Sequence, residues 1–172
     1  GSQRPARISG IPLARWAVLG GNFMTAQIAY DIGLLTHLVD LSEVESITNA
    51  CVSQGKPDNK YAGKPSNEAS EVVKFATDFY SDANLAILLS GGCPEGYDPE
   101  DKSISRQLKN LKYTAPIALS MASDLIDVTA TTTLAEGLDI ELSKLTDIFS
   151  TRDALEGLSA LIEGRRATYT NS

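Results

Sequence analysis

The sequence has very few of the residues that bind metals most tightly. In 172 residues it contains one histidine, His37, and two cysteines, Cys51 and Cys93. These three residues form no cluster, so they cannot supply the four ligands of a structural zinc site. We therefore expect no bound metal.

Long hydrophobic runs and an excess of positive charge are also missing. The densest apolar stretch, Leu85–Leu89, is five residues long, whereas a helix needs about 18 to 20 apolar residues to cross a bilayer. There are 15 basic and 22 acidic residues, which give a formal charge of −7, and such a surface repels nucleic acid. We expect neither a membrane nor a nucleic acid as partner. Because no basic segment followed by an apolar one opens the chain, we expect a cytoplasmic protein.

The common catalytic signatures are absent as well. The sequence has no GxSxG, no glycine-rich phosphate loop, no HExxH and no recognisable Cys/His pair. Glu136 and Glu141 are five positions apart on one predicted helix and so point about 140° away from each other, which favours two solvated carboxylates. His37 has no nucleophile or orienting partner nearby, and Cys51 lies on an apolar helix face, where a small core residue is typical. We assign no catalytic residue in this chain.

Helical periodicity is what the sequence does contain. The length suits one domain, 42% of the residues are hydrophobic, and apolar residues recur at helical spacing through most of the chain. The predicted helices cover 44–51, 69–79, 82–89, 102–112, 115–127, about 17 residues from Thr132 to Phe149, and 151–163.

Local signals predict where several of these helices start and stop. A capping box of Ser42 and Glu45 fits the first helix, while Ser66, Thr114 and Thr151 are expected to cap later ones and Gly164 to end the last. The composition of 55–65 indicates a loop. Leu35–Val39 is the one predicted strand, since it is apolar and β-branched.

Two of the predicted helices have unusual faces. Leu134, Leu138, Leu142, Leu145 and Phe149 share one side of the longest helix, which we expect to be largely buried. In 102–112 the basic side chains lie opposite the apolar ones, namely Lys102, Arg106, Lys109 and Lys112. This basic face could hold phosphates, but a solvated helix face is the favoured interpretation.

Two separated stretches of the chain resemble the crotonase (enoyl-CoA hydratase/isomerase) family. Residues 2–40 are similar to its Gln-Arg turn and following helices, through Ser2-Gln3-Arg4, Leu19-Gly20-Gly21, Thr25-Ala26, Ala29 and Gly33-Leu34-Leu35. Residues 115–169 are similar to the C-terminal end of the family, where Asp153, Glu156-Gly157 and Ala160 match. The resemblance covers about 95 residues and leaves 41–113 uncovered.

The resemblance implies a fold class and a division of the chain. The fold is expected to be mainly α, the helical C-terminal region of a crotonase-type α/β spiral fold, with one short strand near 35–39. Residues 1–40 would follow the catalytic half, 41–113 would be an inserted helical segment, and 114–172 would be a C-terminal helical trimerisation region.

The resemblance also implies a function. The complete protein would be an acyl-CoA enzyme, with enoyl-CoA hydratase as the leading activity and fusion to a 3-hydroxyacyl-CoA dehydrogenase as one arrangement. Alternatives within the family are thioester hydrolysis, as in 3-hydroxyisobutyryl-CoA hydrolase, and enoyl-CoA isomerisation. An alternative of another class is a non-catalytic helical assembly module. The catalytic glutamates and oxyanion hole of the family would lie in its sheet-bearing half, which precedes the Gln-Arg turn.

The expected partners and binding residues follow from the same resemblance. An acyl-CoA would be the substrate, with no further cofactor, and the protein would form a trimer or hexamer. Leu145, Phe149 and Leu161 would cover the acyl or pantetheine chain. Gly164 stands where hydratases often place a lysine that contacts the CoA nucleotide, so that contact would pass to Arg165 or Arg166.

Overall fold

The computed structural model describes residues 1–55 and 63–172, which form helices joined by loops and contain no strand. The mainly α fold class is therefore confirmed. Most of the loop predicted for 55–65 lies outside the described residues. The elements are α1 Gln3–Ser9, α2 Ile11–Val18, α3 Ala26–Asp31, η1 Leu41–Glu43, α4 Val44–Gln54, α5 Glu71–Phe79, α6 Asp82–Leu89, α7 Lys102–Lys112, α8 Pro116–Asp127, η2 Val128–Ala130, α9 Leu134–Ser143, α10 Leu145–Phe149 and α11 Arg152–Glu163.

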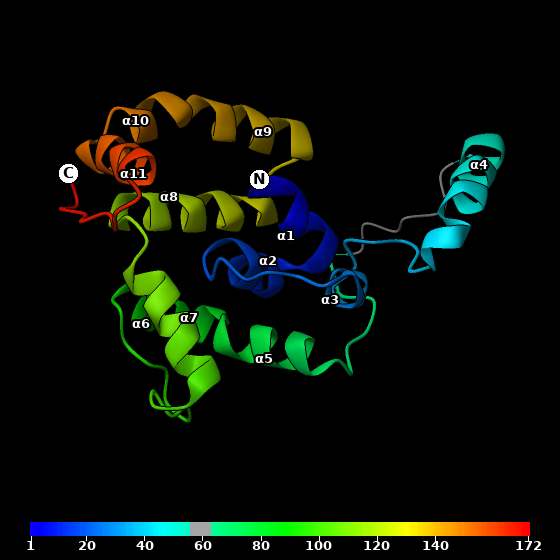
Figure 1. The fold of residues 1–172 in the computed structure, drawn as a ribbon, viewed down its shortest axis with the longest axis horizontal. Coiled ribbons are helices and arrows are strands. Elements are labelled where there is room, and N and C mark those ends of the chain that lie inside the picture. The colour runs from blue at the N-terminus through cyan, green and yellow to red at the C-terminus, as the bar shows by residue number, and fades with distance from the viewer. Residues whose placement is uncertain (56–62) are drawn as a thin grey trace.

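Helix α8 organises the rest of the structure. It crosses the middle of the view in Figure 1, with α9, α10 and α11 on one side and α2, α5, α6 and α7 on the other. The core lies on the second side, where Ala14, Phe79 and Ile126 are fully buried. Helical spacing of apolar residues on α2, α5 and α8 produces this core, because each helix buries one stripe of its surface.

A buried arginine ties three of these helices together. The Arg15 side chain of α2 is 3% exposed, and its guanidinium forms ion pairs with Asp82 at 2.7 Å and Asp127 at 2.6 Å. It also donates a hydrogen bond to the Tyr80 carbonyl oxygen at 3.2 Å. The periodicity of the sequence did not distinguish this arginine from a surface residue.

The helix α4 stands away from the body in Figure 1, and none of its residues is buried. The prediction that Cys51 is a core residue is therefore wrong, since Cys51 is only half-buried. The predicted Ser42–Glu45 capping box is also wrong: Asp40 and Glu43 form the box instead, two residues earlier, at the start of η1. Amphipathic spacing predicted the helix correctly, but it does not show that a neighbour exists to cover the apolar stripe.

The strand predicted for Leu35–Val39 is not present. The segment is irregular, with a bend at Thr36 and no ladder pairing, and Leu35 and Leu38 are 38% and 42% exposed. A strand is defined by its partner, and among residues 1–55 and 63–172 there is no second strand to pair with it. A β-type composition alone is therefore insufficient to form the element.

The long helix predicted from Thr132 to Phe149 is broken at Lys144 into α9 and α10. The Lys144 N–H donates to the Glu141 carbonyl oxygen, three residues back, which tightens the last turn of α9. The expected burial of its apolar side is also wrong, because Leu142 and Phe149 are each 66% exposed. Regular spacing predicted the helical residues but not the bend or the missing cover.

Four further residues are predicted to cap or end helices, and two of them do. Thr151 caps α11 by accepting the Ala154 N–H at 3.0 Å, and Gly164 ends it in the left-handed conformation, as predicted. Ser66 and Thr114 are not caps: α5 begins after Ser70, and the Thr114 hydroxyl donates to the Asn110 carbonyl oxygen at the end of α7. The Thr114 hydroxyl shows that a serine or threonine can bond a nearby carbonyl oxygen instead of capping a helix, so the residue type alone does not fix the boundary.

Candidate functional site

A cavity of about 650 Å³ lies on the side of α8 that faces α9 and the C-terminal tail. Apolar side chains dominate its lining, although Asp124 and Lys144 are also present; the other lining residues are Pro116, Ile117, Ser120, Met121, Leu125, Val128, Ile140 and Asn171. The helix α8 contributes to both the core and this cavity. Leu119 and Ile126 face the core, while Ile117 and Met121 face the cavity.

A second cavity of about 260 Å³ lies where α8, α10 and α11 meet the C-terminal tail. Its walls are again mostly apolar, and include Ile117, Phe149, Leu158 and Tyr169. A Cβ atom on Gly157 would lie 3.2 Å from the Tyr169 hydroxyl, so glycine at this position lets the tyrosine ring pack closely on α11. Both cavities suit an apolar chain rather than a charged group.

The three residues predicted to cover an acyl chain are not brought together. Phe149 lines the second cavity, whereas Leu145 and Leu161 are not among the residues that line either cavity. Leu161 is 79% exposed on the outer face of α11. The shared role of these residues remains a prediction, and in this structure only Phe149 stands at an apolar cavity.

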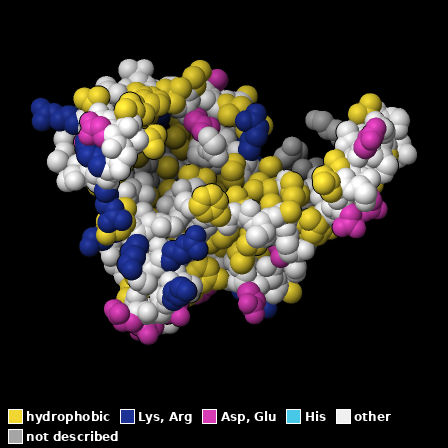
Figure 2. Space-filling model, viewed as in Figure 1, with side chains coloured by type: hydrophobic (Ala, Val, Ile, Leu, Met, Phe, Trp, Pro, Cys, Tyr) yellow, Lys and Arg dark blue, Asp and Glu magenta, His cyan; other side chains and the backbone are white. Residues whose placement is uncertain are grey.

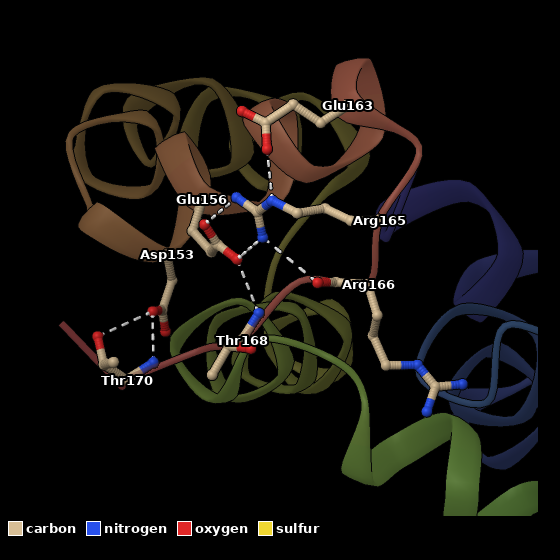
Figure 3. A network of polar contacts seen from close by, with 7 residues as sticks. All are labelled: Asp153, Glu156, Glu163, Arg165, Arg166, Thr168 and Thr170. Carbon is tan, nitrogen blue, oxygen red and sulfur yellow. Dashed lines mark hydrogen bonds and ion pairs between the residues drawn. The ribbon is translucent and has the colours of Figure 1, made fainter.

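Arg165 belongs to a network that fixes the C-terminal tail (Figure 3). Its guanidinium donates to both Glu156 oxygens, at 2.6 and 2.8 Å, and its Nε donates to Glu163 at 2.5 Å. Glu156 also accepts the Thr168 N–H at 2.8 Å. The hydrogen bonds from Arg165, followed by that from Thr168, lower the pKa of Glu156 to about 2. Both ends of this pair stay charged at neutral pH, so Arg165 is already partnered within the chain.

Arg166 points away from this network, as Figure 3 shows. Its guanidinium carbon lies 4.3 Å from the centre of the Tyr113 ring, at the C-terminal end of α7. The tyrosine is 50% exposed. The sequence offers no reason to distinguish the two arginines, but their contacts differ. Arg165 holds the tail, whereas Arg166 lies at the surface beside α7.

Asp153 is a residue whose role the sequence analysis missed. Its side chain is 2% exposed and accepts the backbone N–H groups of Thr170 at 2.7 Å and Asn171 at 2.9 Å. These bonds lay the tail across the first turn of α11. An acidic residue in a first helical turn is common for its favourable interaction with the helix dipole, so position alone gave no signal of a tail contact.

The remaining sequence candidates occupy separate places. His37 is exposed, with its Nδ1 atom 3.0 Å from the Thr36 hydroxyl. Glu136 closes a capping box with Thr133, and the backbone N–H and hydroxyl of Thr133 lower its pKa. Glu141 accepts the Ser2 N–H and pairs with the N-terminal amine. The structure does not assemble these groups into a common site.

Residues 1–55 and 63–172 contain no group of three or more His, Cys, Asp or Glu side chains that could hold a metal ion. Within the same residues, no helix has both the length and the apolar character needed to cross a membrane.

Comparison with known proteins gives one distant similarity. No family model and no solved structure matches the chain. Among curated proteins, it is 31% identical over 80 residues to "Probable enoyl-CoA hydratase 2, mitochondrial" of Arabidopsis thaliana. The match covers 46% of this chain and 26% of the plant protein, so the chain spans about a quarter of that relative. The similarity supports in part the resemblance to the crotonase family.

Proposed function

We propose that this chain is the helical part of an enzyme that acts on acyl-CoA thioesters, and that the reaction is the addition of water to a 2-enoyl-CoA. The observation that carries the proposal is the 31% identity over 80 residues to a plant protein named as an enoyl-CoA hydratase. The two cavities beside α8 support it, because an acyl chain binds in a cavity lined mostly by apolar side chains.

The proposal gives this chain a binding role and not a catalytic one. Hydration of an enoyl thioester needs hydrogen-bond donors for the carbonyl oxygen and a carboxylate or other base to activate water. Three carboxylates of the described residues already form structural hydrogen bonds. Glu136 caps α9, and Asp153 and Glu156 hold the tail. In our proposal the reacting groups therefore come from a part of the enzyme outside these 172 residues.

A non-catalytic assembly module is the second candidate, and the surface of α9, α10 and α11 favours it. Large apolar side chains on these helices are exposed: Leu134 40%, Leu142 66%, Leu145 45%, Phe149 66%, Leu155 68%, Leu158 51%, Leu161 79% and Ile162 86%. An apolar surface of this extent is typical of an interface. Assembly into a trimer is compatible with both candidates.

A chimera tests the enzymatic proposal. The 80 matched residues of the plant hydratase would be replaced by those of this chain, and hydration of crotonyl-CoA would be followed by the loss of the enoyl absorbance. We expect the chimera to retain activity within about tenfold of the parent, a change of about 1.4 kcal/mol in the barrier.

Two controls make the result interpretable. The chain alone should not hydrate crotonyl-CoA, and turnover at an enzyme-like rate would show that our assignment of the reacting groups is wrong. A chimera that folds and assembles like the parent but lacks activity would contradict the proposed function and favour the assembly module.

A further inference from the structure

The outer face of α7 is an exception on an acidic protein. The chain has a formal charge of −7, yet α7 contains four exposed basic side chains and no acidic one: Lys102, Arg106, Lys109 and Lys112. They are three or four positions apart, so like charges are neighbours on the helix surface, which is unfavourable for an isolated helix. None of the four forms an ion pair with another described residue.

The positive charge is concentrated at one end of the helix. Asp98, Glu100 and Asp101 immediately precede α7 and offset the charge at its start. Figure 2 shows the basic side chains spread over α7 toward its link with α8, with acidic side chains below them. The uncompensated end is therefore the C-terminal one, where Lys109 and Lys112 lie. Two lysines exceed the partial negative charge of a helix C-terminus, which is about half a unit.

The C-terminal tail adds a third cation at this end. Arg166 lies over the Tyr113 ring at 4.3 Å, although 53 positions separate the two residues along the chain. Its neighbour Arg165 is held by Glu156 and Glu163, whereas Arg166 has no acidic partner among residues 1–55 and 63–172. We call Lys109, Lys112, Tyr113 and Arg166 the α7 basic end.

The α7 basic end adjoins the second cavity through two segments of chain. Tyr113 is two residues before Ala115, and Arg166 is three residues before Tyr169; both Ala115 and Tyr169 line that cavity. At about 3.3 to 3.6 Å per extended residue, the Cα atoms of Tyr113 and Arg166 each lie within roughly 11 Å of the Cα atom of a residue that lines this cavity, whose apolar wall includes Phe149 and Leu158. The α7 basic end is thus connected to the second cavity by two short stretches of chain.

We propose that the α7 basic end binds the phosphate-bearing head of an amphiphilic ligand whose apolar chain enters the second cavity. Guanidinium and ammonium groups are the usual protein partners of phosphates, and the cavity suits the apolar part. This inference rests on the proposed function and deepens it, since an acyl-CoA has both parts. A nucleic acid fits less well, because α7 is only about 16 Å long and the chain as a whole has a formal charge of −7.

Binding of S-octanoyl-CoA to the 172-residue chain tests the inference by titration calorimetry. S-octanoyl-pantetheine, which lacks the phosphates of the nucleotide, serves as the matched ligand. We expect the doubly substituted K109Q/K112Q chain and the Arg166→Gln chain each to bind octanoyl-CoA at least tenfold more weakly. Binding of octanoyl-pantetheine should change less than twofold in both variants.

Lys74→Gln is the control variant, because it removes one exposed positive charge from α5, away from the α7 basic end. It should leave both affinities unchanged. Circular dichroism and the unfolding midpoint of each variant show whether the chain still folds. Equal octanoyl-CoA affinities in all folded variants, or no binding of octanoyl-CoA and octyl phosphate by the unmodified chain, would overturn the inference.

Octyl phosphate separates this inference from the proposed function. If the α7 basic end binds octyl phosphate but octanoyl-CoA does not bind, the amphiphilic phosphate site stands and the acyl-CoA assignment fails. If octanoyl-CoA binds equally well to the unmodified chain and to both folded variants, the acyl-CoA assignment is retained and the α7 basic end is not its phosphate site.

Discussion

At the scale of single residues, the buried charge of Arg15 joins α2 to α6 and α8. The guanidinium is almost fully enclosed, while its two partners reach solvent: the Asp82 side chain is 90% exposed and that of Asp127 is 40% exposed. Loss of the arginine would leave carboxylates that water can solvate. Loss of both carboxylates would leave a buried cation with only the Tyr80 carbonyl oxygen as a polar contact, which is the costlier situation.

We therefore expect the two ways of breaking this cluster to differ. The D82A/D127A chain should lose about 3 to 5 kcal/mol of unfolding free energy, since it leaves an uncompensated buried charge. Arg15→Met should lose less, because it replaces the charge by an apolar side chain of similar length. Urea unfolding of the three proteins measures the difference, and the opposite order would show that the carboxylates contribute little to the solvation of Arg15.

The Glu156–Arg165 pair predicts a pH dependence. The pKa of Glu156 is about 2 in the folded chain, against a usual value of 4.5, so the unfolded chain binds the proton more readily. The stability from this pair is complete above about pH 4.5 and is lost as the pH falls toward 2.

Glu156→Gln should reduce this loss. We expect the unfolding midpoint of the variant to change less between pH 5 and pH 2.5 than that of the parent chain. Some dependence will remain, since Asp31, Asp101, Glu136 and Glu141 also have lowered pKa values. Identical midpoint curves for the two proteins would exclude a coupling of Glu156 to folding.

At the scale of elements, the sequence predicts the helix boundaries that depend on residues close together along the chain. Thr151 and Gly164 delimit α11 through local hydrogen bonding and a left-handed backbone, both encoded within a few residues. The strand at 35–39, the continuity of the helix through Lys144 and the burial of α4 each depend on a partner distant in sequence or absent. The site shows the same division: Arg165 and Arg166 were identified as candidates, but only the fold separates the partnered one from the exposed one.

The exposure of the η1–α4 segment can be tested with a pair of leucines. Leu41 is 90% exposed, whereas Leu88 of α6 is 1% exposed. Leu41→Ala should change the unfolding free energy by less than about 0.5 kcal/mol, and Leu88→Ala should lower it by about 2 to 5 kcal/mol. A large loss from Leu41→Ala would show that this segment packs against the rest of the chain in solution.

At the scale of the whole molecule, the packing is uneven. The core is enclosed by α2, α5, α7 and α8, while α9, α10 and α11 present a broad apolar surface to solvent. Such a surface favours association. The chain should therefore self-associate at micromolar concentration, with a trimer as the expected species.

Light scattering over a range of concentrations measures this association. The L161E/I162E chain should shift toward the monomer, because both side chains are highly exposed on α11, at 79% and 86%. Val52→Glu, on the separate helix α4, changes an equally exposed side chain and should leave the association unchanged. A constant mass near 18 kDa at all concentrations would exclude the assembly surface on α11.

The attachment of the tail has a practical consequence for handling the protein. Residues 168 to 171 are held by backbone hydrogen bonds to Asp153 and Glu156, and Tyr169 closes one wall of the second cavity. The last residues of the chain are thus part of a ligand-sized compartment. Release of residues 168–171 from α11 would enlarge that compartment. A binding measurement therefore reports on this cavity only while these residues remain attached to Asp153 and Glu156.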